Sequence, residues 1–293
     1  MRILLTGKSG QVGAELHRTL PALGEVIALG RNELDLTSAE AIRTTMRDIK
    51  PDIVVNAAAY TTVDRAETEM DLAMAINGTA PGVIAEEAKR LGAFVVHYST
   101  DYVFDGTKNS PYQEDDTPNP LSIYGQSKLA GEAAVRLSGA PYYIFRTSWV
   151  FAARGQNFVN TILRLARERT ELKIVDDQVG APTWARTIAE TTLQALKARP
   201  LDRGGLYHLT ATGTVTWFGF AQAILARAKA AHPELRVPQL IPITTADYPL
   251  PARRPANSLL DNNLLSTTFG LTCPDWAASL TACMREMLSP TGD

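Results

Sequence analysis

The first half of the chain alternates short apolar runs with longer segments whose apolar residues recur every three or four positions. Runs such as RILLT and DIVVN are typical of strands. In the segments between them, apolar residues share one side of a helix, as Val12, Leu16 and Leu20 do. This pattern predicts strands over 2–6, 25–29, 52–56, 93–98 and 142–147, and helices over 11–20, 39–49 and 70–91.

Strands that alternate with helices indicate βαβ units and a parallel sheet that is covered on both faces. Because such crossovers are right-handed, we expect an α/β fold with a doubly wound parallel sheet of the Rossmann type. The second half is different. Helices are predicted over 157–169, 187–198, 217–230 and 275–287, with strands over 172–175 and 206–209, while the five prolines of 238–255 predict an extended loop.

This change of pattern predicts two domains. A dinucleotide-binding domain is expected over 1–150, its sheet completed by the strand at 142–147, and a smaller α/β substrate domain over 151–293. The helix near 187–198 could return to cover the first sheet, which would make the second domain partly discontinuous.

Composition narrows the classes of function. The 293 residues are 45% hydrophobic and 20% charged, as in an ordinary soluble globular protein, and the net charge of −2 argues against nucleic acid or an anionic membrane as partner. No run approaches the ~20 apolar residues of a membrane span, so we expect a cytoplasmic protein. Two cysteines and four scattered histidines give neither a disulfide framework nor a His/Cys metal centre.

Three glycines follow the first predicted strand. Gly7, Gly10 and Gly13 have the spacing G-x-x-G-x-x-G and precede a predicted helix. Glycine allows a positive φ and a close approach of the backbone to a pyrophosphate, which would lie at the N-terminus of the helix. A tightly packed turn is the alternative, but the position between strand and helix favours a dinucleotide site.

The residues after the second and third strands indicate which dinucleotide binds. Gly30 and Arg31 follow the second strand, with no acid at its tip, which favours NADPH over NADH, although Arg31 could be only a surface charge. Asp35 is placed either to meet the adenine ring or to form a turn. The small side chains of NAAAYT would let a cofactor lie against the backbone.

The sequence YGQSK supplies the candidate proton donor. Tyr124 and Lys128 are four residues apart and share one helix face, so the ammonium is expected to lower the pKa of the phenol below ~10. The strand at 93–98 delivers Ser99, Thr100 and Asp101 to the edge of the sheet that faces ligands, where either hydroxyl could hold a substrate oxygen or cap the strand. A dinucleotide with an acidic tyrosine implies hydride transfer to a carbonyl.

Several segments together carry a family resemblance. GKSGQVG, PDIVVNAAAYTTVD, HYSTDYVFDG, YGQSKLAGE, FRTSWVF, DQVGAPT and PARRPANS resemble the extended short-chain dehydrogenase/reductase superfamily and, within it, the dTDP-4-dehydrorhamnose reductases. The resemblance implies reduction by NADPH or NADH of the C4 ketone of dTDP-4-dehydro-6-deoxy-L-mannose to dTDP-L-rhamnose, a precursor of surface polysaccharides. The alternatives are a sugar-nucleotide epimerase or dehydratase, or a non-catalytic subunit similar to the regulatory subunit of methionine adenosyltransferase.

The resemblance also implies roles for individual residues. Tyr124 matches the general acid, Lys128 its partner and Thr100 the third member of the triad. Arg253 and Arg254 would suit the substrate diphosphate. The cofactor-binding positions are Gly10, Gln11, Val12, Asp35, Leu36, Ala59, Tyr60, Thr61 and Tyr98, and the sugar-nucleotide positions are Thr100, Asp101 and Trp149.

One position departs from the family. Some members form dimers through a metal such as Mg²⁺, which is held by carboxylates. Glu15 matches one of these acids, but Arg186 stands where another is expected. A cation there opposes metal binding, which argues against a metal-bridged dimer, and could pair directly with an acid. We expect no catalytic metal, because the tyrosine already provides the proton, and either a monomer or a homodimer.

Overall fold

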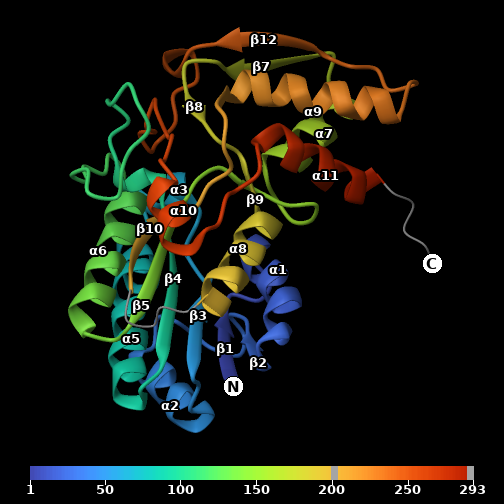
Figure 1. Cartoon of the computed structure of the whole chain (residues 1–293). Helices are drawn as coiled ribbons and strands as arrows, with labels where there is room; N and C mark the ends of the chain where they lie inside the picture. Colours follow the sequence, from blue (N-terminus) through green and yellow to red (C-terminus); the bar gives the residue numbers. More distant parts are fainter. Residues whose placement is uncertain (199–203, 289–293) are drawn as a thin grey trace.

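The computed structural model describes residues 1–198 and 204–288. Its centre is a six-stranded parallel sheet in the order β10-β5-β4-β3-β1-β2 (Figure 1). Because β2 and β3 flank β1 on opposite sides, the winding direction reverses there, and ligands are expected beyond the carboxyl ends of β1 and β3. The strands are β1 Arg2–Thr6, β2 Glu25–Leu29, β3 Ile53–Asn56, β4 Phe94–Thr100, β5 Tyr142–Thr147 and β10 Gly205–His208.

Helices cover both faces of this sheet, which confirms the predicted fold class. On one face, Leu4, Val54 and Val95 pack against α2 Ala39–Ile49, α5 Ala80–Leu91 and α6 Ile123–Ser138. On the other, the alternate residues pack against α1 Gln11–Thr19, α8 Ala185–Ala198 and α10 Asn263–Phe269 (Figure 1). Strands buried on both sides explain why their sequences are continuously apolar.

The sheet receives elements from the second half of the chain. The strand predicted at 206–209 is β10, and it pairs with β5 as the sixth strand. The expectation that the strand at 142–147 completes the sheet is therefore wrong. The helix predicted at 187–198 is α8, whose Ile188 and Ala189 pack on the sheet with Leu16 of α1. The chain leaves the sheet after β5 and returns to it for α8, β10 and α10.

A separate core lies beyond the carboxyl edge of the sheet, at the end of the molecule away from the N-terminus (Figure 1). It packs α7 Phe158–Glu168, α9 Trp217–Ala231 and α11 Trp276–Leu288 against the pair β7 Glu171–Val175 and β12 Gln239–Ile243. The extended loop expected over 238–255 thus contains a strand, and this strand tolerates Pro242 because it has a neighbour on one side only. Two shorter pairs are β6 Val150–Phe151 with β9 Thr183–Trp184, and β8 Val179–Gly180 with β11 Val215–Thr216.

The helix predicted over 70–91 is interrupted. It consists of α4 Met70–Met74, the π-helical η2 Ala75–Thr79, and α5. Asn77 lies in the π-helical turn and is fully buried. Such turns often mark functional sites. The remaining short helices are η1 Leu20–Ala22, α3 Val63–Ala66, η3 Asp101–Val103 and η4 Thr245–Asp247.

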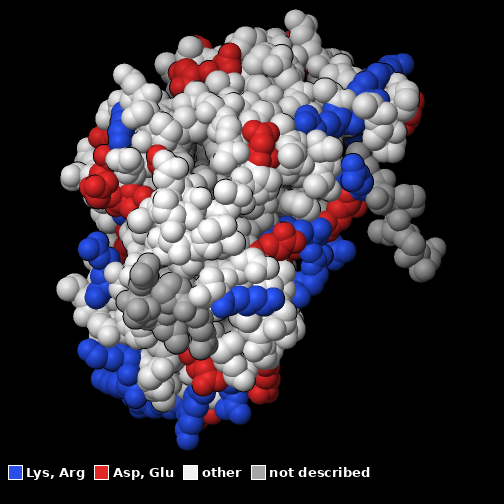
Figure 2. Space-filling model, in the orientation of Figure 1, with Lys and Arg blue, Asp and Glu red and all other residues white. Residues whose placement is uncertain are grey.

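The surface fits the modest net charge. On the face in Figure 2, acidic and basic side chains are interspersed. None of the helices in the described part of the chain is long and apolar enough to span a membrane.

Candidate active site

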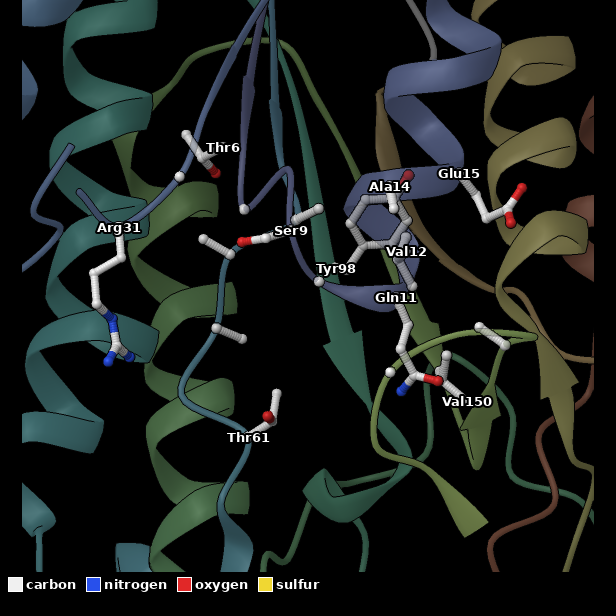
Figure 3. Close-up of a pocket in the computed structure, with 18 of the residues that line it drawn as sticks. Thr6, Ser9, Gln11, Val12, Ala14, Glu15, Arg31, Thr61, Tyr98 and Val150 are labelled. Carbon is white, nitrogen blue, oxygen red and sulfur yellow. The ribbon is translucent and has the colours of Figure 1, made fainter. Parts of the chain in front are cut away.

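A cavity of about 780 Å³ lies at the carboxyl ends of the central strands. Figure 3 shows Arg31 at one end of it and Val150 at the other, with Gln11 near Val150. Both the predicted glycine turn and the predicted proton donor border this one space. The residues singled out from the sequence that line it are Gly7, Gly10, Gln11, Val12, Glu15, Gly30, Arg31, Asp35, Leu36, Ala57, Ala58, Ala59, Thr61, Tyr98, Ser99, Tyr124 and Lys128.

The turn after β1 has no room for a side chain at Gly7 or Gly13. Gly7 has φ +75°, and a Cβ on it would lie 2.6 Å from the backbone nitrogen of Ala58. A Cβ on Gly13 would lie 2.0 Å from the carbonyl oxygen of Gly7. Gly10 precedes α1, and among the described residues no side chain caps that helix and no acid lies in its first turn. Its N–H groups can therefore bind an anion, so the residues present fit a dinucleotide diphosphate.

The tip of β2 carries charges of both signs. Arg31 is exposed and borders the cavity. Although no acid follows β2 directly in the sequence, the carboxylate of Glu33 folds back to accept a hydrogen bond from the Gly30 nitrogen at 2.6 Å, and Lys8 pairs with it. Asp35 accepts hydrogen bonds from the nitrogen and hydroxyl of Thr37 at 2.9 and 2.8 Å. Asp35 thus forms a turn and also borders the cavity.

Helix α6 places Tyr124 and Lys128 at the inner wall. Ser122 caps it by accepting a hydrogen bond from the Gly125 nitrogen at 3.2 Å, so Tyr124 lies in the first turn. A Cβ on Gly125 would lie 2.2 Å from the carbonyl oxygen of Tyr102, which explains the glycine of YGQSK. Lys128 is buried and donates a hydrogen bond to the Tyr98 carbonyl at 2.5 Å. This bond ties the helix to β4 next to the cavity.

Burial, rather than the lysine, governs the acidity of the tyrosine. Desolvation raises the pKa of Tyr124 to about 12, opposed by the Thr100 side chain and reinforced by the charge of Asp101. The expectation of a lowered pKa is wrong, because desolvation disfavours the phenolate more than its surroundings stabilise it. Burial also lowers the pKa of Lys128 to about 8, partly offset by Glu132. The phenol is therefore firmly protonated at neutral pH.

The end of β4 supplies the other polar groups. The Thr100 hydroxyl donates to a carboxylate oxygen of Asp101 at 3.0 Å and accepts from the Tyr102 nitrogen at 3.2 Å, so it also caps η3. Desolvation raises the pKa of Asp101 to about 6, opposed by the side chain of Ser258. Ser99 borders the cavity, whereas Thr100 interacts with Tyr124. The two hydroxyls that the sequence left open thus occupy different surroundings.

Some predicted residues lie outside the lining of this cavity. Tyr60 is buried and donates its hydroxyl to Glu69 at 2.6 Å. Arg254 forms a two-pronged ion pair with Asp64, with distances of 3.1 and 2.8 Å, while Arg253 is exposed. Within the described chain, the cavity lining does not include Tyr60, Thr100, Asp101, Trp149, Arg253 or Arg254.

The structure adds residues that sequence reasoning missed. The Asn77 side chain accepts from the Tyr60 nitrogen at 2.8 Å and donates to the Tyr60 carbonyl at 2.9 Å and to the Ser127 hydroxyl at 3.1 Å. It thereby joins the loop after β3 to the helix of Tyr124. An amide within an otherwise apolar helical pattern was the available signal. Other unforeseen residues in the cavity lining include Thr6, Ile76, Thr147, Val150 and residues 152–156.

Arg186 pairs directly with acids, as its sequence position suggested. Its Nε lies 3.1 Å from Glu15 and its Nη2 2.6 Å from Glu286, and its guanidinium lies 4.5 Å from the ring of Trp184. The arginine joins α1, α8 and α11. The described residues contain no group of three or more side chains suited to hold a metal ion.

Comparison with known proteins identifies the family. A family model described as the RmlD substrate binding domain matches residues 1–289. A dTDP-4-dehydrorhamnose reductase of Burkholderia thailandensis is 52% identical over 297 residues, with 99% of this chain and 100% of the relative covered. The chain belongs to the dTDP-4-dehydrorhamnose reductase family. The Escherichia coli member is 45% identical, with 99% of each chain covered.

Solved structures of this family agree with the fold. A dTDP-4-dehydrorhamnose reductase from Clostridium acetobutylicum is 38% identical with a TM-score of 0.92, covering 98% of this chain and 99% of the other. The Bacillus anthracis member, solved in complex with NADP, is 35% identical with a TM-score of 0.91, covering 97% of this chain and 99% of the other. A UDP-glucose 4-epimerase from Thermus thermophilus, at 19% identity and TM-score 0.82, shares the fold.

Proposed function

We propose that this chain is an NADPH-dependent reductase that converts dTDP-4-dehydro-6-deoxy-L-mannose (dTDP-4-dehydrorhamnose) to dTDP-L-rhamnose. One observation carries the proposal: the glycine turn lines the same cavity as Tyr124 and Lys128. Family membership over the whole chain supports the sugar nucleotide as substrate. The enzyme would act in the cytoplasm, as a monomer or a homodimer.

The cofactor is assigned to the cavity by the groups that border it. The turn over Gly7 and Gly10 and the free N–H groups at the start of α1 would hold the diphosphate. Arg31, at the far end, would meet the 2′-phosphate, with NADH accepted less well. The NADP complex of the Bacillus anthracis member supports this choice. NADPH, when bound there, supplies the hydride for the ketone carbon.

Tyr124 would supply the proton. Because burial keeps its phenol protonated, Tyr124 can hydrogen-bond the C4 carbonyl and protonate the oxygen as negative charge develops on it. Thr100, which interacts with Tyr124, would share in orienting that oxygen. Lys128 would place a positive charge behind the phenolate and donate to the nicotinamide ribose.

The sugar nucleotide would approach from the side of the second core. We assign Asp101 and Trp149 to the deoxysugar, and Arg253 and Arg254 to the diphosphate. The two arginines are not equivalent, because Asp64 already neutralises Arg254. The exposed Arg253 is therefore the better candidate for a direct ion pair with the substrate.

The deciding experiment incubates the purified protein with dTDP-4-dehydrorhamnose and either NADPH or NADH. The expected result is dTDP-L-rhamnose, with one equivalent of NADPH consumed for each product. An epimerase or dehydratase would regenerate its cofactor and cause no net loss of NADPH absorbance. A regulatory subunit would give no product and would instead be recovered with a stable enzyme partner, and either result would refute the reductase.

A further inference from the structure

Trp149 has an unusual backbone and an unusual neighbour. It lies two residues beyond β5 and has φ +47°, a left-handed conformation that L-residues adopt at a cost. Its indole stacks on that of Trp217, with ring centroids 3.5 Å apart and planes at 8°. Strain held by a specific contact is often part of a functional site.

The opposite face of the same indole is covered by Gly180. A Cβ on Gly180 would lie 2.5–2.8 Å from Cε2, Cδ2 and Cζ2 of Trp149, which places this glycine against the ring face. It cannot share a face with Trp217, because a Cβ there would collide with the Trp217 ring, and no Trp217 atom is among its nearest neighbours. The glycine of DQVGAPT is therefore required by the indole of Trp149.

Trp217 is itself held in place. Its indole nitrogen donates to the side-chain oxygen of Gln178 at 3.2 Å, and Gln178 donates to the Thr245 hydroxyl at 3.0 Å. Phe158 packs beside it, with ring centroids 4.6 Å apart. Trp217 begins α9, directly after the strand β11 that pairs with β8 and Gly180. Trp217 on one face of Trp149 and Gly180 on the other thus belong to one hydrogen-bonded unit.

This unit is continuous with the candidate active site. The Ser258 nitrogen donates to the Val179 carbonyl at 2.9 Å, next to Gly180. The side chain of Ser258 interacts with the carboxylate of Asp101. The position of Trp149 is therefore linked, through Val179 and Ser258, to the end of β4.

We propose that Trp217 is a positioning residue for the sugar nucleotide and acts by clamping Trp149 against Gly180. The proposal rests on the proposed function, in which Trp149 contacts the deoxysugar. With both of its faces covered, Trp149 can offer only the edge of its indole to the substrate. It therefore contacts the sugar by that edge, including its N–H, rather than by stacking.

The test compares Trp217→Leu and Trp217→Phe with the control Trp276→Phe, since Trp276 belongs to the same core but lies edge-on to Phe220. Stacked indoles give an exciton couplet in circular dichroism, which we expect to be lost in both Trp217 variants and kept in the control. In Trp217→Leu, the KM for the sugar nucleotide should rise by about tenfold to 10²-fold, as for a misplaced contact group. Trp217→Phe should recover most of this loss, while the Kd for NADPH stays within about twofold in all variants.

Gly180→Ala provides a second route should Trp217→Leu fail to fold. Its methyl group would displace Trp149 while leaving the Trp217 side chain unchanged. The KM for the sugar nucleotide should therefore rise, as in Trp217→Leu. Adding dTDP to the wild type should leave the couplet unchanged. Loss of the couplet with dTDP, or a wild-type KM in folded Trp217→Leu, would overturn the clamp.

The variant Trp149→Phe separates this inference from the proposed function. A wild-type KM in that variant would refute both the proposed sugar contact of Trp149 and the clamp by Trp217. Product formation from dTDP-4-dehydrorhamnose would still support the reductase. Absence of that product from the wild-type protein would refute the reductase itself.

Discussion

Two regions of the cavity wall differ in composition: the backbone end, at the glycine turn, and the ionisable end, at Tyr124 and Lys128. At the glycine turn, the wall is backbone, and its capacity for anions comes from the N–H groups at the start of α1. At the other end, the wall is made of ionisable side chains, and burial shifts the pKa of both Tyr124 and Lys128. Cofactor binding should therefore respond to added volume, and the chemical step to pH and to the loss of single groups.

The largest effect is expected at the ionisable end, from Tyr124→Phe. Because we propose Tyr124 as the proton donor, kcat should fall by about 10²–10⁴-fold. The Kd for NADPH, measured by fluorescence titration, should change by less than about twofold, because the backbone end is intact. Tyr102→Phe is the matched control, since that ring packs edge-on at 5.5 Å. A Tyr124→Phe enzyme with wild-type turnover would refute the assignment.

The next largest effect is expected at the backbone end, from Gly13→Ala. The added methyl group would collide with the Gly7 carbonyl, so we expect a loss of about 1–3 kcal/mol in the free energy of unfolding. Affinity for NADPH should fall by more than about tenfold as the turn moves. In Gly10→Ala, the Cβ would meet the same oxygen at 3.4 Å, so this variant should unfold like the wild type. Equal denaturation midpoints for the two variants would contradict this view of the turn.

The pH dependence should separate the two ends. Lys128, with its pKa lowered to about 8, is charged below that pH and neutral above it, whereas Tyr124 stays protonated to about 12. The rate of hydride transfer at saturating substrates should therefore fall above pH 8, by up to about tenfold per unit. The Kd for NADPH should change much less over the same range, because a neutral Lys128 amine can still donate to the nicotinamide ribose. A transfer rate that is flat to pH 10 would show that the lysine charge is not needed.

The smallest effect is expected at the exposed border of the cavity, from Arg31→Gln. Loss of one charge-assisted contact with the 2′-phosphate should weaken NADPH binding by about tenfold and leave NADH unchanged. Arg18→Gln is the control, because that arginine also lines the cavity but pairs with Glu15 at 2.9 Å. Equal losses for the two cofactors would show that Arg31 does not distinguish them.

The sequence predicted the elements whose structure depends on local pattern. The bounds of β1, β2, β5 and α2 agree with those expected, because strands that pack apolar residues on both faces of the sheet and a one-sided helix leave clear apolar patterns. The grouping of the glycine turn with Tyr124 and Lys128 was also foreseeable. Parallel strands bring their carboxyl ends to one edge, and both segments follow or flank such strands.

Features that depend on distant contacts were not foreseeable from local pattern. The π-helical turn around Asn77 depends on its bonds with Tyr60 and Ser127, which lie 17 and 50 residues away. β10 joins the sheet only because β5 leaves an edge to pair with. The pKa of Tyr124 is raised, whereas a lowered pKa was expected. The i,i+4 rule describes a solvated helix surface, and this phenol is buried.

The departure of the chain from the sheet after β5, and its return for α8 and β10, has a consequence for engineering. A fragment that stops near residue 150 would expose the flank of β5 and lack a helix that covers one face of the sheet. Such a fragment should aggregate rather than bind nucleotide. Recombination between relatives to exchange their sugar specificity must therefore graft the intervening segments together and cannot rely on a single crossover.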